Sequence, residues 1–389
     1  MSANDASIWS DLAEHAQLAF DDARMLPASA YTSTNVLARE HERVFASEWI
    51  CVGRTADLPA RGDYLTATIP SATGEQRSII VLRGDDGTIG AFDNVCVHRG
   101  SPLLQGCGNE ARITCPYHAW VYRLDGQLIG APYMNRTVDG NGRPFNAADH
   151  RLAPLRHEEW EGFLFVTQNP DASDLCSRLA GLTEVVGRYQ MAAYVPVFRQ
   201  VDVWDTNWKL LYENFIDAYH VFKVHKNSFA KDGDNTLDTT MHAGNGHFAH
   251  HVVVHDGDAK SGVAHRDNTS LTDEWRRTIV LGAAFPTHVM QLQPDWLWYL
   301  QLSPLGVDRV RIRWDVSVAP EVLADQADPT AYVADLLGLL NMVNSEDQPI
   351  VEGVFRALRP SMTRSPLSYL ERNVYDFDRY IAGALTRSA

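Results

Sequence analysis

Two short segments that each pair a cysteine with a histidine constrain this chain more than any other feature. Cys96-Val97-His98 is followed, after sixteen residues, by Cys115-Pro116-Tyr117-His118, and each segment comes just after a β-like run. Two thiolates and two imidazoles on paired hairpin tips can supply four metal ligands, and the turn from Gly106 to Gly108 supplies the bend between the tips. The chain must therefore adopt a fold that brings both tips together.

The four side chains alone leave two metal centres open. Tetrahedral zinc accepts mixed sulfur and nitrogen ligands, so a structural zinc site could use the same residues. However, His98-Arg99-Gly100 together with Cys115-Pro116-Tyr117-His118-Ala119-Trp120 closely resembles the Rieske iron–sulfur signature. The resemblance implies a [2Fe–2S] cluster in which one iron takes Cys96 and Cys115 and the other takes His98 and His118. Neutral imidazoles leave less negative charge on a cluster than thiolates do, which raises its reduction potential.

A second set of candidate ligands lies about a hundred residues further on, in the segment from Trp208 to His225. Asn214, Asp217 and His220 are three positions apart, so on a helix they share one polar face. Burial of such a face is costly unless something binds it. His225 comes five positions after His220, so the two imidazoles can meet only if the helix ends or bulges between them.

This spacing alone is weak evidence, because capping or core histidines explain it as well. Next to a Rieske signature, it resembles the mononuclear iron site of Rieske oxygenases, in which two histidines and one carboxylate leave positions open for dioxygen, substrate and water. The resemblance implies that His220 and His225 bind the metal. It also implies that Asp347, in Asn344-Ser345-Glu346-Asp347-Gln348, supplies the carboxylate, with Glu346 as the alternative.

The same resemblance gives Asp217 a connecting role. It implies that Asp217 contacts His220 and, across a subunit interface, His118, which joins the mononuclear site to the cluster of a neighbouring subunit. A carboxylate on the free ring nitrogen of a metal-bound histidine also fixes its tautomer. Asp217 and Asn214 are therefore the candidate catalytic residues beside the metal.

Aromatic side chains are the candidates for a substrate pocket. Trp296 and Trp298 alternate on a strand-like run and share a face, and with Tyr219 and Phe222 they could wall an aromatic pocket or a cation cage. Core packing is the competing interpretation for at least half of them. One further stretch is rich in histidine, and either another metal site or an exposed strand and loop explains it. Its members are His242, His247, His250, His251 and His255.

Composition excludes some classes of partner. The chain has 34 Lys and Arg against 49 Asp and Glu, a net charge of −15, which would repel nucleic-acid phosphates. The first thirty residues lack the basic start and apolar run of a secretory signal, and no segment approaches the roughly 18 consecutive apolar residues of a membrane helix. We expect a cytoplasmic protein that binds neither nucleic acid nor a membrane.

The remaining cysteines carry less information. Five cysteines in 389 residues are an odd and sparse set, which does not indicate a disulfide framework. We expect Cys51 and Cys176 to be buried, inert thiols and Cys107 to be a packed loop thiol. The segment Gly106–Ala111 matches the G-x-G-x-x-A pattern, but it runs into a metal ligand instead of a helix, so no nicotinamide or flavin site is expected.

The pattern of apolar residues and turns changes twice along the chain. Residues 1–48 have helical periodicity, residues 49–167 contain short β-rich runs between turns, and residues 168–389 return to helices and strands. The resemblance extends over nearly the whole chain and is closest to the catalytic α subunits of ring-hydroxylating oxygenases and to choline and betaine monooxygenases. It implies an α+β fold in which a Rieske domain of antiparallel sheets (49–167) is inserted into a helix-grip catalytic domain. That domain, formed by 1–48 and 168–389, has a central antiparallel sheet flanked by helices.

The activity that follows from the resemblance is that of a terminal oxygenase. Such a component uses O2 and electrons from NAD(P)H, delivered by a separate reductase with or without a ferredoxin, and is usually a homotrimer. Aromatic ring hydroxylation, and monooxygenation or demethylation of an N-methyl or quaternary ammonium compound, all use the same metal residues. The alternative is a non-redox, zinc-stabilised binding protein.

Overall fold

The computed structural model describes residues 3–138, 141–231, 238–255 and 262–387. The chain divides into one unit of Met1–Phe45 with Ser173–Ala389 and a second unit of Ala46–Ala172. From the sequence, we expect the divisions after residues 48 and 167. None of the helices among the described residues is long and apolar enough to cross a bilayer.

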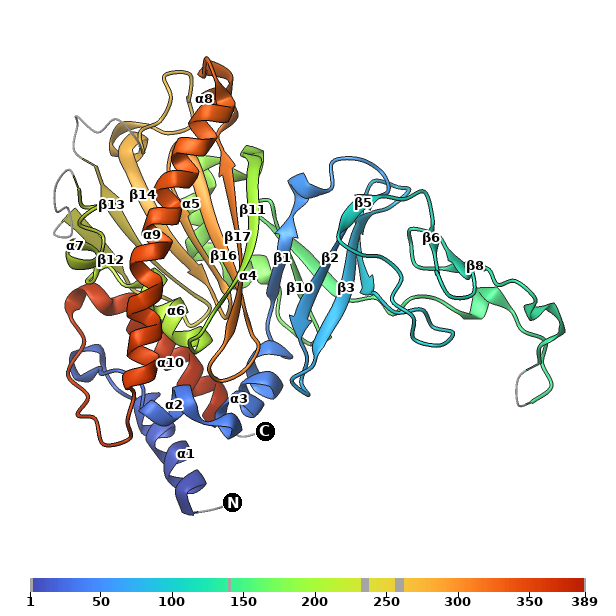
Figure 1. Ribbon diagram of the computed structural model, residues 1–389, viewed down its shortest axis with the longest axis horizontal. Helices are drawn as coiled ribbons and strands as arrows, with labels where there is room; N and C mark the ends of the chain where they lie inside the picture. The colour runs from blue at the N-terminus through green and yellow to red at the C-terminus, as the bar shows by residue number, and fades with distance from the viewer. Residues whose placement is uncertain (1–2, 139–140, 232–237, 256–261, 388–389) are drawn as a thin grey trace. The chain divides into compact units, whose positions relative to one another are not determined.

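A seven-stranded antiparallel sheet forms the centre of the first unit (Figure 1). Its strand order is β11-β17-β16-β15-β14-β13-β12. The strands are β11 (Val195–Trp204), β12 (Thr239–His242), β13 (Phe248–Val254), β14 (Thr278–Ala284), β15 (His288–Leu292), β16 (Trp296–Pro304) and β17 (Val310–Val318). Neighbours in sequence are neighbours in the sheet from β12 to β17, as antiparallel pairing allows, and β11 pairs with β17 at the far edge.

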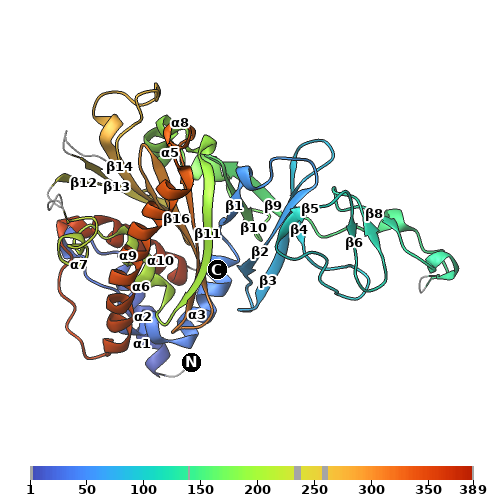
Figure 2. The same ribbon diagram turned by 45° about the horizontal axis from the view of Figure 1, so that its top comes forward.

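Helices cover both faces of this sheet. They are α1 (Ala3–His15), α2 (Ala28–Thr32), α3 (Thr34–Glu40), α4 (Leu175–Arg178), α5 (Ala180–Val186), α6 (Trp208–Ile216), α7 (Val221–Val224), α8 (Pro320–Asp325), α9 (Pro329–Ala357) and α10 (Arg372–Thr386). Side chains alternate along β13: Phe248 meets Gly181 of α5, whereas His251 bonds Asn373 of α10. Figures 1 and 2 show α9 crossing the face that also carries α6 and α10.

The second unit consists of three small antiparallel sheets. Their strand orders are β1-β10-β9, β4-β3-β2-β5 and β6-β7-β8. The strands are β1 (Ile50–Arg54), β2 (Asp63–Pro70), β3 (Gln76–Arg83), β4 (Ile89–Asp93), β5 (Cys107–Asn109), β6 (Ile113–Thr114), β7 (Val121–Tyr122), β8 (Leu128–Gly130), β9 (Arg156–Trp160) and β10 (Phe163–Thr167). The Cys96 segment lies between β4 and β5, and the Cys115 segment lies between β6 and β7.

A buried ion pair fastens the N-terminal helices to α6. Lys209 Nζ lies 2.6 Å from Glu40 Oε1, and the indole of Trp208 donates to Glu40 Oε2 at 2.8 Å. Both charged side chains are inaccessible to solvent. Removal of one partner from such a pair leaves an uncompensated buried charge, which is far more costly than loss of an exposed pair.

We therefore predict that Lys209→Met lowers the free energy of unfolding of the first unit by about 3–5 kcal/mol, measured by chemical denaturation followed by circular dichroism. The double variant Lys209→Met with Glu40→Leu should recover much of this loss, since no charge is then left unpaired. As a control, Asp85→Asn removes a partner of the exposed pair Arg61–Asp85 and should cost less than about 1 kcal/mol. A loss of similar size in Lys209→Met and Asp85→Asn would contradict the interpretation.

Candidate metal centres

The break after α6 positions the two histidines. Asn207 caps the start of α6, accepting from the backbone N–H of Lys209, and the helix ends at Ile216 because Asp217 adopts an extended backbone. The next helix, α7, is a single turn with His220 at its start and His225 at its end. The prediction that a helix ends between the two imidazoles is confirmed. The prediction that Asn214, Asp217 and His220 share one helical face is wrong, because the helix stops before Asp217.

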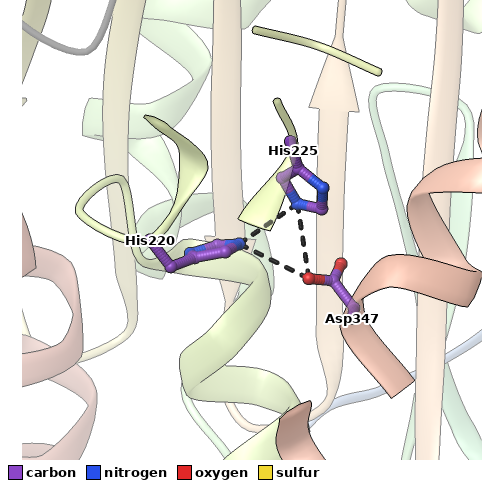
Figure 3. Close-up of side chains that lie close together, drawn as sticks. All are labelled: His220, His225 and Asp347. Carbon is purple, nitrogen blue, oxygen red and sulfur yellow. Dashed lines mark hydrogen bonds and ion pairs between the residues drawn. The ribbon is translucent and has the colours of Figure 1, made fainter. Parts of the chain in front are cut away.

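Three potential ligand atoms converge on one point (Figure 3). His220 Nε2 lies 3.2 Å from His225 Nε2 and 3.6 Å from Asp347 Oδ1, and His225 Nε2 lies 3.3 Å from Asp347 Oδ1. Ligand atoms bound about 2.1 Å from one metal ion at right angles are separated by about 3 Å. Two histidines and one carboxylate in this arrangement match the facial triad of non-haem iron, which leaves the opposite side of the metal open.

Carboxylates outside the triad hold both imidazoles from behind. His220 Nδ1 lies 3.1 Å from Asp217 Oδ2, and His225 Nδ1 lies 3.0 Å from Glu346 Oε2. Each ring thus has its Nδ1 on a carboxylate and its Nε2 directed at the triad centre, the tautomer that a metal ligand needs. Ser228 also donates to Glu346 Oε2, at 2.6 Å. The alternative ligand Glu346 therefore orients His225 and does not converge with the triad.

Electrostatics favour a cation at the triad centre. Burial alone would raise the pKa of Asp347, but hydrogen bonds with His220 and His225 outweigh it and lower that pKa to about 2. Burial alone would lower the pKa of His220, but bonds to Asp217 and Asp347 raise it to about 10. The site stabilises added positive charge, and a divalent metal ion would take the place of that proton.

The two segments that carry the Cys/His pairs fold into matching loops. The N–H of Cys96 donates to Ser101 O at 2.9 Å, and the carbonyl of Cys96 accepts from the N–H of Gly100 at 3.0 Å. Cys115 repeats this with Trp120 O and Ala119 N–H, at 2.8 and 3.0 Å. The residue four positions after each cysteine is left-handed, with φ of +77° at Gly100 and +55° at Ala119. Such a conformation strains alanine, as is common at functional sites.

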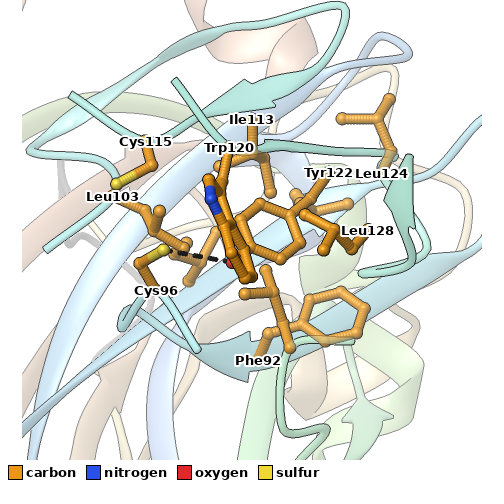
Figure 4. Close-up of a cluster of buried hydrophobic side chains, with 12 residues drawn as sticks. Phe92, Cys96, Leu103, Ile113, Cys115, Trp120, Tyr122, Leu124 and Leu128 are labelled. Carbon is orange, nitrogen blue, oxygen red and sulfur yellow. Dashed lines mark hydrogen bonds between the residues drawn. The ribbon is translucent and has the colours of Figure 1, made fainter. Parts of the chain in front are cut away.

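The two cysteines of these loops lie at one edge of a buried hydrophobic cluster (Figure 4). Cys96 and Cys115 belong to this cluster, and the rings of His98 and His118 have centroids 4.7 Å apart. His98 stacks on Trp120 at 4.6 Å. Burial would raise the pKa of Cys115, but the N–H groups of His118 and Tyr117 lower it below its ordinary value, which favours the thiolate.

The separation of the ligand atoms distinguishes between the zinc site and the iron–sulfur cluster that the two Cys/His pairs allow. Among the residues that the structure describes, the triad is the only group of three or more His, Cys, Asp or Glu side chains whose ligand atoms lie within 4.8 Å of one another. Ligands of one tetrahedral zinc lie within about 4 Å of one another. The wider set formed by Cys96, His98, Cys115 and His118 fits a two-iron cluster, which spreads its ligands over two metal ions.

The predicted pocket residues fall into two groups. Trp296 and Trp298 are buried on one face of β16, and Trp298 packs against Phe215 with ring centroids 5.2 Å apart. Tyr219 and Phe222 are about half exposed, with their rings 5.9 Å apart. Their part in binding substrate stays a prediction.

The predictions for the remaining cysteines, the glycine-rich segment and the histidine-rich stretch have mixed outcomes. Cys51 is buried as predicted, but Cys107 is exposed on the edge strand β5 and Cys176 is exposed on α4, whose inward face is taken by Leu175. Gly106–Ala111 leads into strand β5 and no helix follows it. The histidines of β12 and β13 form no three-ligand group among the described residues; His242 and His250 instead stack, 4.6 Å apart.

Sequence reasoning missed two residues of the sites. Tyr122 OH lies 3.1 Å from Cys96 Sγ and accepts from the N–H of Val97. Ser228 supports Glu346. A tyrosine seven residues after Cys115 and a serine three residues after His225 carry no pattern that distinguishes them from ordinary core and loop residues.

Comparisons with known proteins agree with this geometry. The profile described as ring hydroxylating alpha subunit (catalytic domain) matches residues 186–387, and that of the Rieske [2Fe-2S] domain matches residues 48–148. The quaternary ammonium Rieske monooxygenase CntA has a similar structure over 97% of this chain and 98% of its own, with a TM-score of 0.79 and 24% identity. A naphthalene 1,2-dioxygenase from Rhodococcus reaches a TM-score of 0.77 at 21% identity, over 98% of each chain.

Curated relatives are oxygenase subunits. The carnitine monooxygenase oxygenase subunit of Acinetobacter baumannii is 36% identical over 213 residues, 53% of each chain. The glycine betaine monooxygenase oxygenase subunit of Chromohalobacter salexigens is 38% identical over 201 residues, 51% of this chain and 43% of that one. Choline monooxygenase of Beta vulgaris is 26% identical over 92% of this chain and 76% of its own length. The chain thus spans about half the length of the first two relatives.

The fold and the two ligand sets define an α+β protein with a Rieske [2Fe–2S] domain and a separate catalytic domain suited to a mononuclear iron. The chain belongs to the family of ring-hydroxylating α subunits. This membership agrees with the iron–sulfur interpretation of the Cys/His pairs and not with the zinc-stabilised alternative.

The position of Glu346 generates a prediction for the triad. Glu346→Gln should weaken iron binding at the triad by about 10–100-fold, because His225 loses the carboxylate that fixes its tautomer, whereas the cluster absorption should not change. Competition against a chelator measures the affinity. Asp335→Asn, an exposed carboxylate on the same helix, is the matched control and should bind iron as the parent does. Equal affinity in both variants would refute the orienting role of Glu346.

Proposed function

We propose that this chain is the oxygenase component of a multicomponent system that hydroxylates a small quaternary ammonium compound, using O2 and electrons from a reductase. The observation that supports this most strongly is the presence of two separate ligand sets in one chain. One set, on the loops of Cys96 and Cys115, suits a cluster that passes single electrons. The other, the triad of His220, His225 and Asp347, suits a metal with an open side.

Each set of residues has a defined task in this proposal. When bound, the cluster supplies electrons one at a time and the mononuclear iron activates dioxygen. Cys96, His98, Cys115 and His118 hold the cluster, and Tyr122 OH stabilises charge on Cys96 Sγ. The triad occupies one side of its metal, while Asp217 and Glu346 keep the two imidazoles in the tautomer that binds it.

The substrate class rests on relatives and on aromatic residues near the triad. The curated relatives named above act on carnitine, glycine betaine or choline, all of which carry a quaternary ammonium group. Aromatic faces attract such cations. Phe215 follows Asn214 at the end of α6 and packs against Trp298, so these two rings are candidates for the cation-binding wall. The net charge of −15 also favours a cationic substrate over an anionic one.

Partners and location extend the proposal. In this proposal the electrons come from NAD(P)H through a separate reductase, and both proteins act in the cytoplasm. The chain assembles as a homotrimer, in which Asp217 of one subunit approaches the His118 of the next. The exposed position of Tyr219 and Phe222, on either side of His220, leaves this part of the surface open to a second chain.

The direct test is oxygen uptake coupled to product formation, with a reductase and NAD(P)H. Carnitine, glycine betaine and choline should each be compared with aromatic acids, and at least one quaternary amine should be hydroxylated. Turnover of aromatic acids alone would reject the substrate class and retain the oxygenase.

His220→Ala should lose at least about 100-fold in turnover with an unchanged cluster spectrum, because only the mononuclear iron is lost. His247→Ala, outside the triad, is the control; turnover by His220→Ala at the parental rate would reject the iron site.

Asp217 should act on electron delivery. With iron(II) added to keep the triad filled, since His220 has lost its orienting carboxylate, Asp217→Ala is expected to slow oxidation of the reduced cluster by about 10–100-fold in a single turnover with substrate present. Lys223→Ala, an exposed change on α7, should leave that rate unaltered. Equal rates in the parent and in Asp217→Ala would refute the connecting role.

A further inference from the structure

A cavity of about 200 Å3 lies between α6, α9 and α10, and its polar lining is acidic. Four carboxyl groups line it, and no Lys or Arg does. They are Glu213, Asp217, Glu371 and Asp378. Asn214 also lines the cavity, so one end of it reaches the residues behind His220, while the rest of the wall is apolar.

The two deepest carboxyl groups have few partners. Asp378 is completely buried beside the Glu213 carboxyl group and the Leu26 backbone, and its oxygen Oδ2 lies 4.0 Å from His15 Nε2. Glu213, 8% exposed, accepts from the hydroxyl of Tyr31 at 2.9 and 3.1 Å. The nearby ammonium of Lys209 is already paired with Glu40 at 2.6 Å. Two ionised carboxyl groups that are buried side by side repel each other and lack water, so a proton on one of them removes much of the cost.

The titratable groups around Glu213 and Asp378 also favour a proton on this pair. Burial first, and then repulsion from Glu213, raises the pKa of Asp378 well above its ordinary value, and burial raises the pKa of Glu213 to about 8. Tyr31 faces the pair from α2 and stays neutral, since burial raises its pKa. His15, from α1, is also neutral because burial lowers its pKa to about 4. Glu371, at the partly exposed rim, adds only further negative charge.

The proposed reaction needs protons at this place. Hydroxylation consumes two electrons and two protons for each dioxygen: C–H + O2 + 2e− + 2H+ gives C–OH + H2O. The reductase supplies the electrons, but the protons must reach a buried site. A cavity of about 200 Å3 has room for several water molecules at about 30 Å3 each, and its carboxyl groups offer the polar partners that such water needs.

Building on the proposed function, we infer that Glu213 and Asp378 form a proton store for the mononuclear site. The pair shares one proton in the resting protein. During turnover the proton leaves the carboxyl pair and passes along water in the cavity towards Asn214 and Asp217, and the pair becomes fully ionised. A proton from solvent, entering past the partly exposed Glu371, reloads it. No electron moves through the pair.

Infrared spectroscopy tests the store without reference to activity. The oxidised holoprotein at pH 7 should show the carbonyl band of a protonated carboxylic acid that shifts in D2O, changes frequency in Glu213→Gln or in Asp378→Asn, and is lost in the double variant. Glu352→Gln is the matched control: burial alone would raise the pKa of Glu352, but hydrogen bonds outweigh it and lower that pKa, so the band should persist. If the parent and the double variant Glu213→Gln with Asp378→Asn have identical carboxylic acid bands, the pair is ionised at pH 7 and the inference is overturned.

Turnover tests the delivery step. Glu213→Gln should form product about 100-fold more slowly, the scale of a lost proton donor, while iron content and the rate at which the reductase reduces the cluster stay unchanged. A merely structural role would instead reduce metal content or cluster reduction. Product formation by Glu213→Gln at the parental rate on both sides of pH 8 would overturn the inference while the proposed function stands. If the proposed function itself is wrong, the result is different: the parent protein hydroxylates none of the substrates tested.

Discussion

The convergence of three lone-pair atoms on one point is the constraint from which the rest of the catalytic unit follows. His220 Nε2, His225 Nε2 and Asp347 Oδ1 lie 3.2 to 3.6 Å apart, and they come from two distant segments of the chain. To bring them together, α6 must end at Ile216 and α9 must pass the turn of α7 with Asp347 on its inner face. Such an arrangement is electrostatically strained without a cation, which explains why carboxylates hold both rings from behind.

The N-terminal helices support this arrangement although they supply no ligand. Glu40 of α3 pairs with Lys209, and Tyr31 of α2 donates to Glu213, so two buried polar contacts fix α6 from one side. These contacts explain why the residues that precede the second unit in the chain and those that follow it belong to one structural unit. The same packing leaves Glu213 and Asp378 in a desolvated place, where ionised carboxyl groups are unfavourable. Support of the metal site and storage of a proton thus have one physical origin.

Features were predictable from the sequence where the residues that form them lie close together in the chain. Cys96, His98, Cys115 and His118 are close in sequence, and the five-residue separation of His220 from His225 required a helix break that the structure has. Asp347 came from the resemblance, because nothing in its spacing identifies a partner 122 residues after His225. The burial of Cys107 and Cys176 was predicted incorrectly, since the sequence does not say which face of a short element is occupied by its neighbours. The partners of Asp378 depend wholly on tertiary packing, and no local pattern announces them.

The central claim is that one chain carries two distinct iron environments, one with inorganic sulfide and one without. Quantitative iron and acid-labile sulfide analysis of the purified protein, combined with electron paramagnetic resonance of its reduced form, tests this most directly. The account predicts three irons and two sulfides per chain and a Rieske-type signal. One further sample, Asp347→Ala, should retain two irons and two sulfides. A zinc-loaded protein without sulfide, or iron loss from both sites together in Asp347→Ala, would contradict the account.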